Sequence, residues 1–444
     1  MPTEKPPPWE SYWGWVVVLA RFTALFMLVG TYKCFGVLLD YYIEDLDATA
    51  AEAGGASVLF IATVYFTSPF FGVLADMHGP NGARIWIMVG GVLASTALCL
   101  SSISTNWYQL AFFLGLAGVG YGMVQVVTVA PLLMYFTDKF GLANGLSAAG
   151  AAVGMTVLPP LTEYWIEQYS WRGATIILGV INLHTTVAGA LMRPPTSCKD
   201  KKTYSLLFGS DDGEDVPVYE LNKYLKPLKR FLLMMREHLS LGIFLNNPRF
   251  MLYQFIFLLA GLQVAGWHVF LVPNALSQGI HSIDAAFLAS IGGLGNFIGR
   301  GFNGPLLDYH IFSDSMLYAL DHIICAIALL FDPLAKEYAT MAILAFWAGL
   351  TIGCSYALCV VIAKNLAEEG KYIMASVGWA HFSMGFGALF GGPLVGMTYD
   401  KTGNYHYGFL MMGGFELLLT TLTFIELMHR RHKNPELKDK YLVM

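Results

Sequence analysis

Long apolar stretches separated by short polar segments dominate the pattern along the chain. Each stretch has about 18 residues or more, enough for a helix to cross a hydrocarbon core about 30 Å thick. The pattern therefore predicts an all-α membrane protein with twelve transmembrane helices, and not a soluble enzyme. We expect the spans at residues 13–39, 57–75, 84–104, 107–136, 143–165, 172–192, 250–276, 283–308, 314–334, 338–363, 374–398 and 405–429.

The composition supports this prediction and excludes several classes of function. Of the 444 residues 56% are hydrophobic and 13% are charged, with a mean hydropathy of +0.54, whereas charged residues make up about a quarter of soluble domains. The net charge of −5 gives no electrostatic reason to expect a nucleic-acid partner. The cysteines show no spacing typical of a metal site. The lipid bilayer is the expected partner, and no metal or cofactor is expected.

The positions of Lys and Arg predict the orientation in the membrane. An even number of spans places both termini on one side, and that side also holds Arg84, Lys139 and Lys364, whereas the opposite loops carry acidic residues such as Glu44 and Asp47. Basic residues favour the cytoplasmic side, so both termini are expected there. The predicted organisation is a cytoplasmic N-terminus (1–12), an N-terminal six-helix bundle (13–192), a cytoplasmic linker (193–249), a C-terminal six-helix bundle (250–429) and a cytoplasmic tail (430–444).

The linker contains a run, Tyr219 to Phe244, in which basic residues alternate with leucines and methionines. This pattern is typical of an amphipathic helix that lies on the cytoplasmic leaflet. A flexible linker with incidental helix is the alternative.

An internal repeat divides the spans into two sets of six. Gly72-x-x-x-Asp76 closes span two and Gly304-x-x-x-Asp308 closes span eight, 232 residues later. Span five ends with Pro160 followed by leucine, and span eleven ends with a Pro-Leu pair at a nearly equal offset. Such repeats predict two pseudo-symmetric six-helix bundles around a central site, the arrangement of the major facilitator superfamily.

Ionisable residues inside spans are the candidates for function, because a charge at the bilayer centre costs at least ~2.5–3.5 kcal/mol. Arg300 lies about 12 Å from the Asp308 end of its helix at 1.5 Å per residue, and Asn296 is one turn away on the same face. A guanidinium in a low-dielectric cavity can bind a carboxylate bidentately; a structural ion pair is the alternative. Asp321 and His322 are expected to begin or line span nine without touching substrate.

Four residues near the ends and middle of spans one and seven are weaker candidates. Lys33 either binds substrate or extends to the outer interface, and its neighbour Tyr32 is taken with it as a candidate for substrate binding. Arg21 is expected to extend to the inner interface. His268 lies in a glycine-flanked stretch of span seven that suits a cavity wall, although packing histidines are more common.

Three motifs resemble the monocarboxylate transporter family of the major facilitator superfamily. They are Glu10-Ser11-Tyr12-Trp13-Gly14-Trp15 before span one, the run Tyr-Phe-Thr-Asp-Lys-Phe-Gly-Leu-Ala-Asn-Gly at 135–145, and Trp-Arg-Gly at 171–173. The resemblance covers the whole membrane region, and the combination is specific.

This resemblance implies roles for three residues. Lys33 falls on the family's substrate and proton-coupling lysine, and Arg300 on its substrate-binding arginine. The residue one turn before that arginine is an aspartate in the proton-coupled members, but here it is Asn296. An amide cannot take up and release a proton at physiological pH.

The resemblance therefore leaves two functions open. One is alternating-access transport of a small, lactate- or pyruvate-like monocarboxylate across the plasma membrane, with protons as the coupled ion. The other is a proton-independent uniporter or exchanger of a carboxylate-bearing zwitterion such as creatine, carnitine or an aromatic amino acid. Some relatives also need a single-span glycoprotein chaperone. A receptor that kept the fold without transporting is a further alternative.

Overall fold

The computed structural model describes residues 8–78, 81–136, 140–195, 247–308, 312–366 and 373–433. In the first half of the chain the helices are α1 (Pro8–Asp45), α2 (Ala50–Met77), α3 (Gly82–Ser101), α4 (Trp107–Gln125), α5 (Val129–Tyr135), α6 (Phe140–Asn182) and α7 (His184–Leu191). In the second half they are α12 (Pro248–Ser277), α13 (Ser282–Asp308), α14 (Asp314–Phe331), α15 (Tyr338–Leu366), α16 (Ile373–Thr402) and α17 (His406–Lys433). The amphipathic run expected at 219–244 lies outside the described residues.

The described helices confirm the predicted all-α fold with twelve spans. Ten stretches of the described chain are long and apolar enough to cross a membrane. The longest, Ala143–Leu191, reverses direction at Ser170, whose φ of 62° and ψ of 170° interrupt α6, so it provides two spans. Helix α16 has 30 residues and completes the set. Only helices satisfy every backbone polar group inside lipid without a partner strand.

Several helix ends are fixed by local capping. The Asn106 side chain accepts a hydrogen bond from the backbone of Gln109 at the start of α4. Asn247 does the same for Phe250 at the start of α12, where Pro248 occupies the first turn. Such caps satisfy backbone N–H groups that have no partner within the helix. They place the helix starts close to the predicted boundaries.

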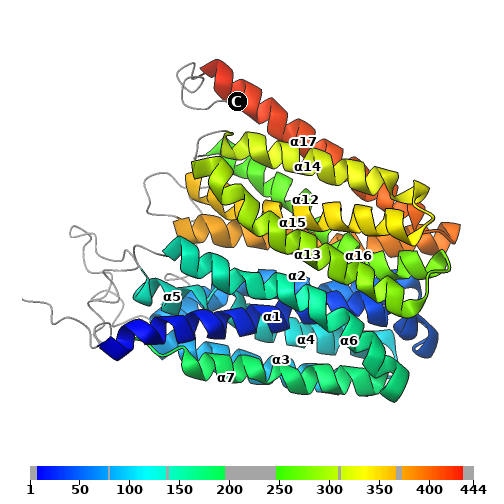
Figure 1. Ribbon diagram of the computed structural model, residues 1–444, viewed down its shortest axis with the longest axis horizontal. Coiled ribbons are helices and arrows are strands. Elements are labelled where there is room, and N and C mark those ends of the chain that lie inside the picture. Colours follow the sequence, from blue (N-terminus) through cyan, green and yellow to red (C-terminus); the bar gives the residue numbers. More distant parts are fainter. Residues whose placement is uncertain are drawn as a thin grey trace, which may run out of the picture.

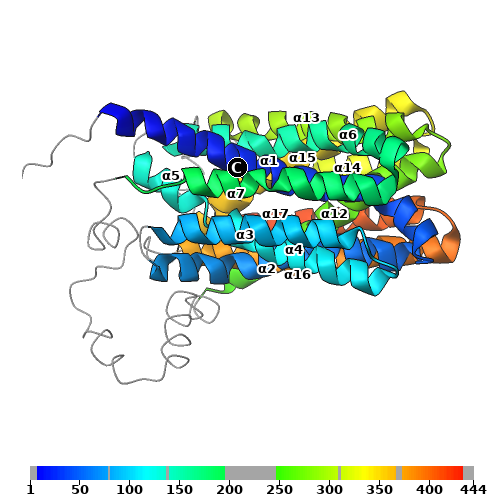
Figure 2. The same ribbon diagram turned by 90° about the horizontal axis from the view of Figure 1, so that it is seen from below.

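The two halves lie side by side, with the second half above the first in Figure 1. Helix α1 begins and α17 ends at the same end of the bundle (Figure 1), which we name the terminal end; the opposite end is the far end. Among the helix pairs that join the halves are α2 with α16, α6 with α13, α1 with α12, and α2 with α12. Figure 2 shows α6 and α13 along one edge of the bundle and α2 and α16 along the other.

Small residues bring these helix pairs close together. A Cβ atom on Gly396 of α16 would lie 2.4 Å from the Ala51 backbone of α2, and the Asp400 carboxylate accepts hydrogen bonds from Ala50 N at 2.9 Å and Ala51 N at 3.0 Å. A carboxylate at a helix N-terminus is favoured by the helix dipole. The far ends of the two halves are therefore held together.

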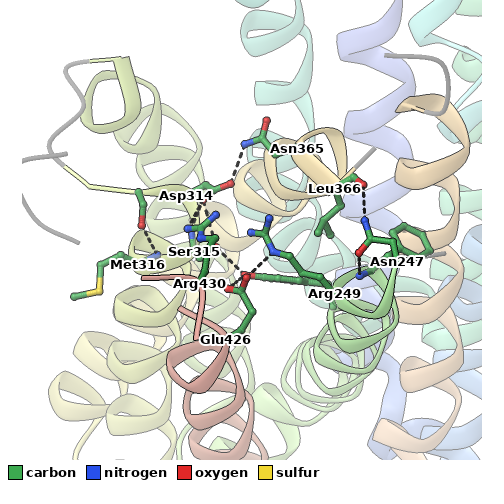
Figure 3. A network of polar contacts seen from close by, with 12 residues as sticks. Asn247, Arg249, Asp314, Ser315, Met316, Asn365, Leu366, Glu426 and Arg430 are labelled. Atoms are coloured by element: carbon green, nitrogen blue, oxygen red, sulfur yellow. Dashed lines mark hydrogen bonds and ion pairs between the residues drawn. The ribbon is translucent and has the colours of Figure 1, made fainter. Parts of the chain in front are cut away.

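The C-terminal half has its own polar network at the terminal end (Figure 3). Arg249 Nε of α12 lies 2.5 Å from Glu426 Oε1 of α17. Asp314 of α14 lies 3.8 Å from Arg430 of α17 and accepts a hydrogen bond from Asn365 of α15 at 2.8 Å. These contacts join the ends of four helices, so this half is braced to move as one body.

Close packing of α1 against α6 gives a first prediction. A Cβ atom on Gly154 would lie 2.2 Å from the Phe26 carbonyl oxygen, whereas one on Gly145 of the same helix would meet nothing within 4 Å. We expect Gly154→Ala to destabilise the protein by about 1–3 kcal/mol, because backbone atoms cannot move aside cheaply. The matched control Gly145→Ala should preserve or raise stability. Thermal unfolding of both purified variants tests this, and equal unfolding temperatures would contradict it.

Candidate functional site

Helices α1 and α12 cross at the interface between the halves. Tyr32 OH donates to the Ala265 carbonyl oxygen at 3.4 Å, across a sequence separation of 233 residues, nearly the offset of the internal repeat. A Cβ atom on Gly36 would lie 2.9 Å from the carbonyl oxygens of His268 and Val269. The first helices of the two halves thus meet at equivalent positions, as expected for a crossing near the pseudo-twofold axis.

Lys33 is buried at this crossing. Its side chain is 0% exposed, its ammonium donates to the His268 carbonyl oxygen at 3.3 Å, and it lies 3.7 Å from the ring centroid of Trp267. The carbonyl dipole and the aromatic face both favour a cation. Neither contact neutralises the charge of the ammonium. Because the side chain is fully buried, Lys33 does not extend to the outer interface but remains inside the protein.

His268 lies near both candidate cations. Its ring lies 5.1 Å from the Tyr32 ring in an edge-on arrangement, and it interacts electrostatically with both Lys33 and Arg300. Its Nδ1 is buried and has no hydrogen-bond partner among the described residues. An unpartnered buried polar atom is costly unless a ligand or water satisfies it.

Arg300 and Asn296 form a second group, on α13. Arg300 Nε donates to Asn296 Oδ1 at 2.9 Å, and Asn296, 1% exposed, keeps its Nδ2 without a partner in the described chain. The Arg300 guanidinium lies 5.4 Å from the ring centroid of Tyr356 on α15, whose hydroxyl is hydrogen-bonded to that of Tyr65 on α2. An amide orients the guanidinium here, but it cannot balance its charge.

Neither Lys33 nor Arg300 belongs to any ion pair that the structure shows between described residues. Tyr32, Lys33 and His268 are in contact with one another, as are Asn296 and Arg300. The two groups are linked by electrostatic interactions through His268. The arrangement is a positively charged site between the two halves, with Lys33 buried and Arg300 half-buried, and it suits an anion.

Arg21 differs from its expected position. It is buried, and its guanidinium donates to Asn144 Oδ1 at 2.9 Å and to Ser147 Oγ at 2.6 Å. The expectation that it extends to the inner interface is wrong, because the polar side chains of α6 provide acceptors inside the bundle. Arg21 therefore joins α1 to α6.

Three aromatic residues around the site, Trp267, Tyr65 and Tyr356, were not among the predicted site residues. Aromatic side chains are ordinary in transmembrane helices, so their types carry no functional signal. Whether such a side chain contacts Lys33 or Arg300 depends on which helices pack against each other.

Comparisons with known proteins agree with this architecture. The family model described as Major Facilitator Superfamily matches residues 21–330. A crystal structure of a POT family transporter in complex with a thioalcohol-conjugated peptide has a TM-score of 0.68 and covers 94% of this chain and 96% of its own, at 14% identity. That likeness shows a shared fold.

Relatives of known name are similar over most of the chain. Monocarboxylate transporter 13 of Rattus norvegicus is 28% identical over 414 residues, 93% of this chain and 88% of that protein. Monocarboxylate transporter 12 of Xenopus laevis is 28% identical over 97% of this chain and 92% of its own length. Monocarboxylate transporter 2 of Homo sapiens is 28% identical over 93% and 85%. The chain belongs to the Major Facilitator Superfamily and, within it, to the monocarboxylate transporter family.

Proposed function

We propose that the protein is a carrier that moves a small, lactate- or pyruvate-like monocarboxylate across the plasma membrane by alternating access. The observation that carries this proposal is the pair of cations inside the bundle, the buried Lys33 and the half-buried Arg300, which have no carboxylate partner among the described residues. The names of the relatives support the same substrate class.

The physical reason is charge balance. Moving a charge out of water costs several kcal/mol even after relaxation, and a partner of opposite sign offsets that cost. A substrate carboxylate can bind the Arg300 guanidinium bidentately, while Lys33 attracts it and His268 Nδ1, where it carries a proton, donates a hydrogen bond. Tyr32 and Asn296 Nδ2 are the remaining donors near the anion. The bound anion supplies the charge that the protein lacks.

Transport then requires the halves to rock about this site. The far end is closed by the contacts of Asp400 with the start of α2, so these hydrogen bonds must break when the carrier opens there. The crossing of α1 and α12 lies at the interface and is a natural pivot. Rigid-body motion of one half against the other is the general mechanism of carriers with repeated halves.

A second candidate function follows from Asn296. Because this amide cannot take up and release a proton at physiological pH, a carrier that lacks another proton site would be a proton-independent uniporter or exchanger. A zwitterion such as creatine, carnitine or an aromatic amino acid is then a suitable substrate. The distribution of Lys and Arg supports cytoplasmic termini in either case. On the basis of the family resemblance, we also propose a single-span glycoprotein chaperone as a partner of this protein.

The first test is uptake of labelled lactate by proteoliposomes, with and without an acid-outside gradient. Arg300→Leu should reduce uptake by about thirtyfold or more, because a buried, hydrogen-bonded charge pair contributes about 2–5 kcal/mol. The control Arg193→Leu, at an exposed position, should leave uptake unchanged. Normal uptake by the Arg300 variant would contradict the assignment of this site, and no uptake by the parent would redirect the search to the zwitterions.

Lys33 allows stability and function to be separated. We expect Lys33→Met to abolish uptake but to raise the free energy of unfolding by about 1 kcal/mol or more, since an apolar side chain of similar size avoids the desolvation of a buried charge. Lys401→Met, at an exposed position, is the control and should change neither property. Thermal unfolding and uptake are measured on the same preparations. A less stable Lys33 variant would show that the cation is structural.

Asn296→Asp tests the second candidate function. If the carrier is proton-independent, the parent is indifferent to external acid, and the variant should acquire stimulation by acid because a carboxylate beside Arg300 can bind and release a proton. Initial uptake rates over a range of external pH values measure this. Strong acid stimulation of the parent itself would reject the proton-independent candidate.

A further inference from the structure

A separate group of buried polar side chains lies within the C-terminal half, where α14, α15 and α17 pack together. The His322 Nδ1 atom pairs with the Glu416 carboxylate. Ser355 Oγ donates to Asp321 Oδ2 at 2.5 Å and lies 3.1 Å from His322 Nε2. The four side chains form one continuous chain of hydrogen bonds, which we name the buried relay.

The hydrogen bonds determine where protons are held. The Ser355 hydroxyl has one proton and donates it to Asp321, so His322 Nε2 must donate to the serine oxygen. The hydrogen bond between His322 Nδ1 and Glu416 needs one more proton. If the proton is on Nδ1, the pair is an imidazolium and a carboxylate; if it is on Glu416, the pair is a neutral imidazole and a carboxylic acid. In both cases the buried relay carries a net charge of −1.

That negative charge has no basic partner in the described chain. The titratable neighbours that face the relay carry no positive charge: they are Tyr318 and Cys325 of α14 and Cys354 of α15. Glu426, the next acidic residue on α17, is already paired with Arg249. Binding one further proton would make the relay neutral, which burial favours.

Glu416 is the end of the relay on α17. It is 1% exposed, and its Oε1 has no hydrogen-bond partner among the described residues. A buried carboxylate oxygen without a donor is costly. Glu416 was not among the residues expected from the sequence, although it lies inside the last predicted span as Arg300 lies inside its own.

The relay is adjacent to the anion site through α15. Ser355 belongs to the relay, and the next residue, Tyr356, lies beside the Arg300 guanidinium and is hydrogen-bonded to Tyr65 of the other half. A displacement of α15, on anion binding or when the halves rock, would therefore move Ser355 in the relay and Tyr356 beside Arg300 together. Consecutive residues of one rigid helix give the physical connection that coupling requires.

We propose that Asp321, His322, Ser355 and Glu416 form a proton-binding site that provides the coupling step Asn296 cannot. This inference rests on the proposed carboxylate transport. One proton enters from the compartment to which the site is open, binds to a relay carboxylate, and leaves as a proton to the other compartment after the halves have rocked. No other bond forms or breaks.

The test uses the purified full-length protein and the variants Glu416→Gln and Asp321→Asn. The control is Asp332→Asn, a buried carboxylate of the same half that accepts a hydrogen bond from Asn274 and lies outside the relay. Infrared difference spectra on acidification report protonated carboxyl groups without any substrate. Lactate counterflow, which needs no net proton movement, shows that each variant is folded.

A carboxyl band should appear in the parent on acidification, disappear in at least one relay variant and persist in the control. With an acid-outside gradient of about one pH unit, 1:1 coupling supports about tenfold accumulation of lactate, which should fall to equilibration in that variant while counterflow is retained. Unchanged accumulation in both relay variants, or a parent that equilibrates lactate without concentrating it, would overturn the proposal. A parent that carries no lactate would reject the proposed substrate, and the infrared band would still decide whether the relay binds a proton.

Discussion

The cost of holding a positive charge inside a low-dielectric protein governs the architecture around Lys33. Its ammonium is fully buried where α1 and α12 cross, and its contacts are a backbone carbonyl and the Trp267 ring. Such contacts lower the cost without cancelling the charge. The crossing itself depends on Gly36, since a side chain there would push the two helices apart. A tightly packed helix pair thus holds a buried charge that has no ion-pair partner among the described residues.

The repeated halves explain why this crossing is central. Helices α2 and α13 occupy equivalent places in the two repeats, and each packs on the other half, against α16 and α6 respectively. The pairs flank α1 and α12 on two sides (Figure 2). Glycines at these interfaces allow backbone contact, while polar networks such as that of Arg249 and Glu426 brace the interior of one half. Bodies that are rigid inside and in contact along smooth small-residue faces can move relative to each other.

Charge is separated into two places in the C-terminal half. The positive site contains Arg300, oriented by Asn296, and the negative relay contains Asp321, His322 and Glu416. Both border α15, at consecutive residues. The neutral amide of Asn296 beside Arg300 cannot take up a proton, so in our proposal the anion and the proton are held at separate places. The two places are separated by about 100° around α15, the angle between consecutive residues of a helix with 3.6 residues per turn.

The sequence by itself determined the fold class and the cations inside the spans. Lipid requires each spanning segment to satisfy its own backbone, so long apolar runs identified the helices, and the cost of a charge in a span singled out Lys33 and Arg300. Only the tertiary structure decided which groups these residues meet. It turned Arg21 inward to α6, set Tyr356 beside Arg300, and joined Glu416 to His322 across 94 residues of sequence. Periodicity determines which residues share one face of a helix; which helix that face meets depends on packing in three dimensions.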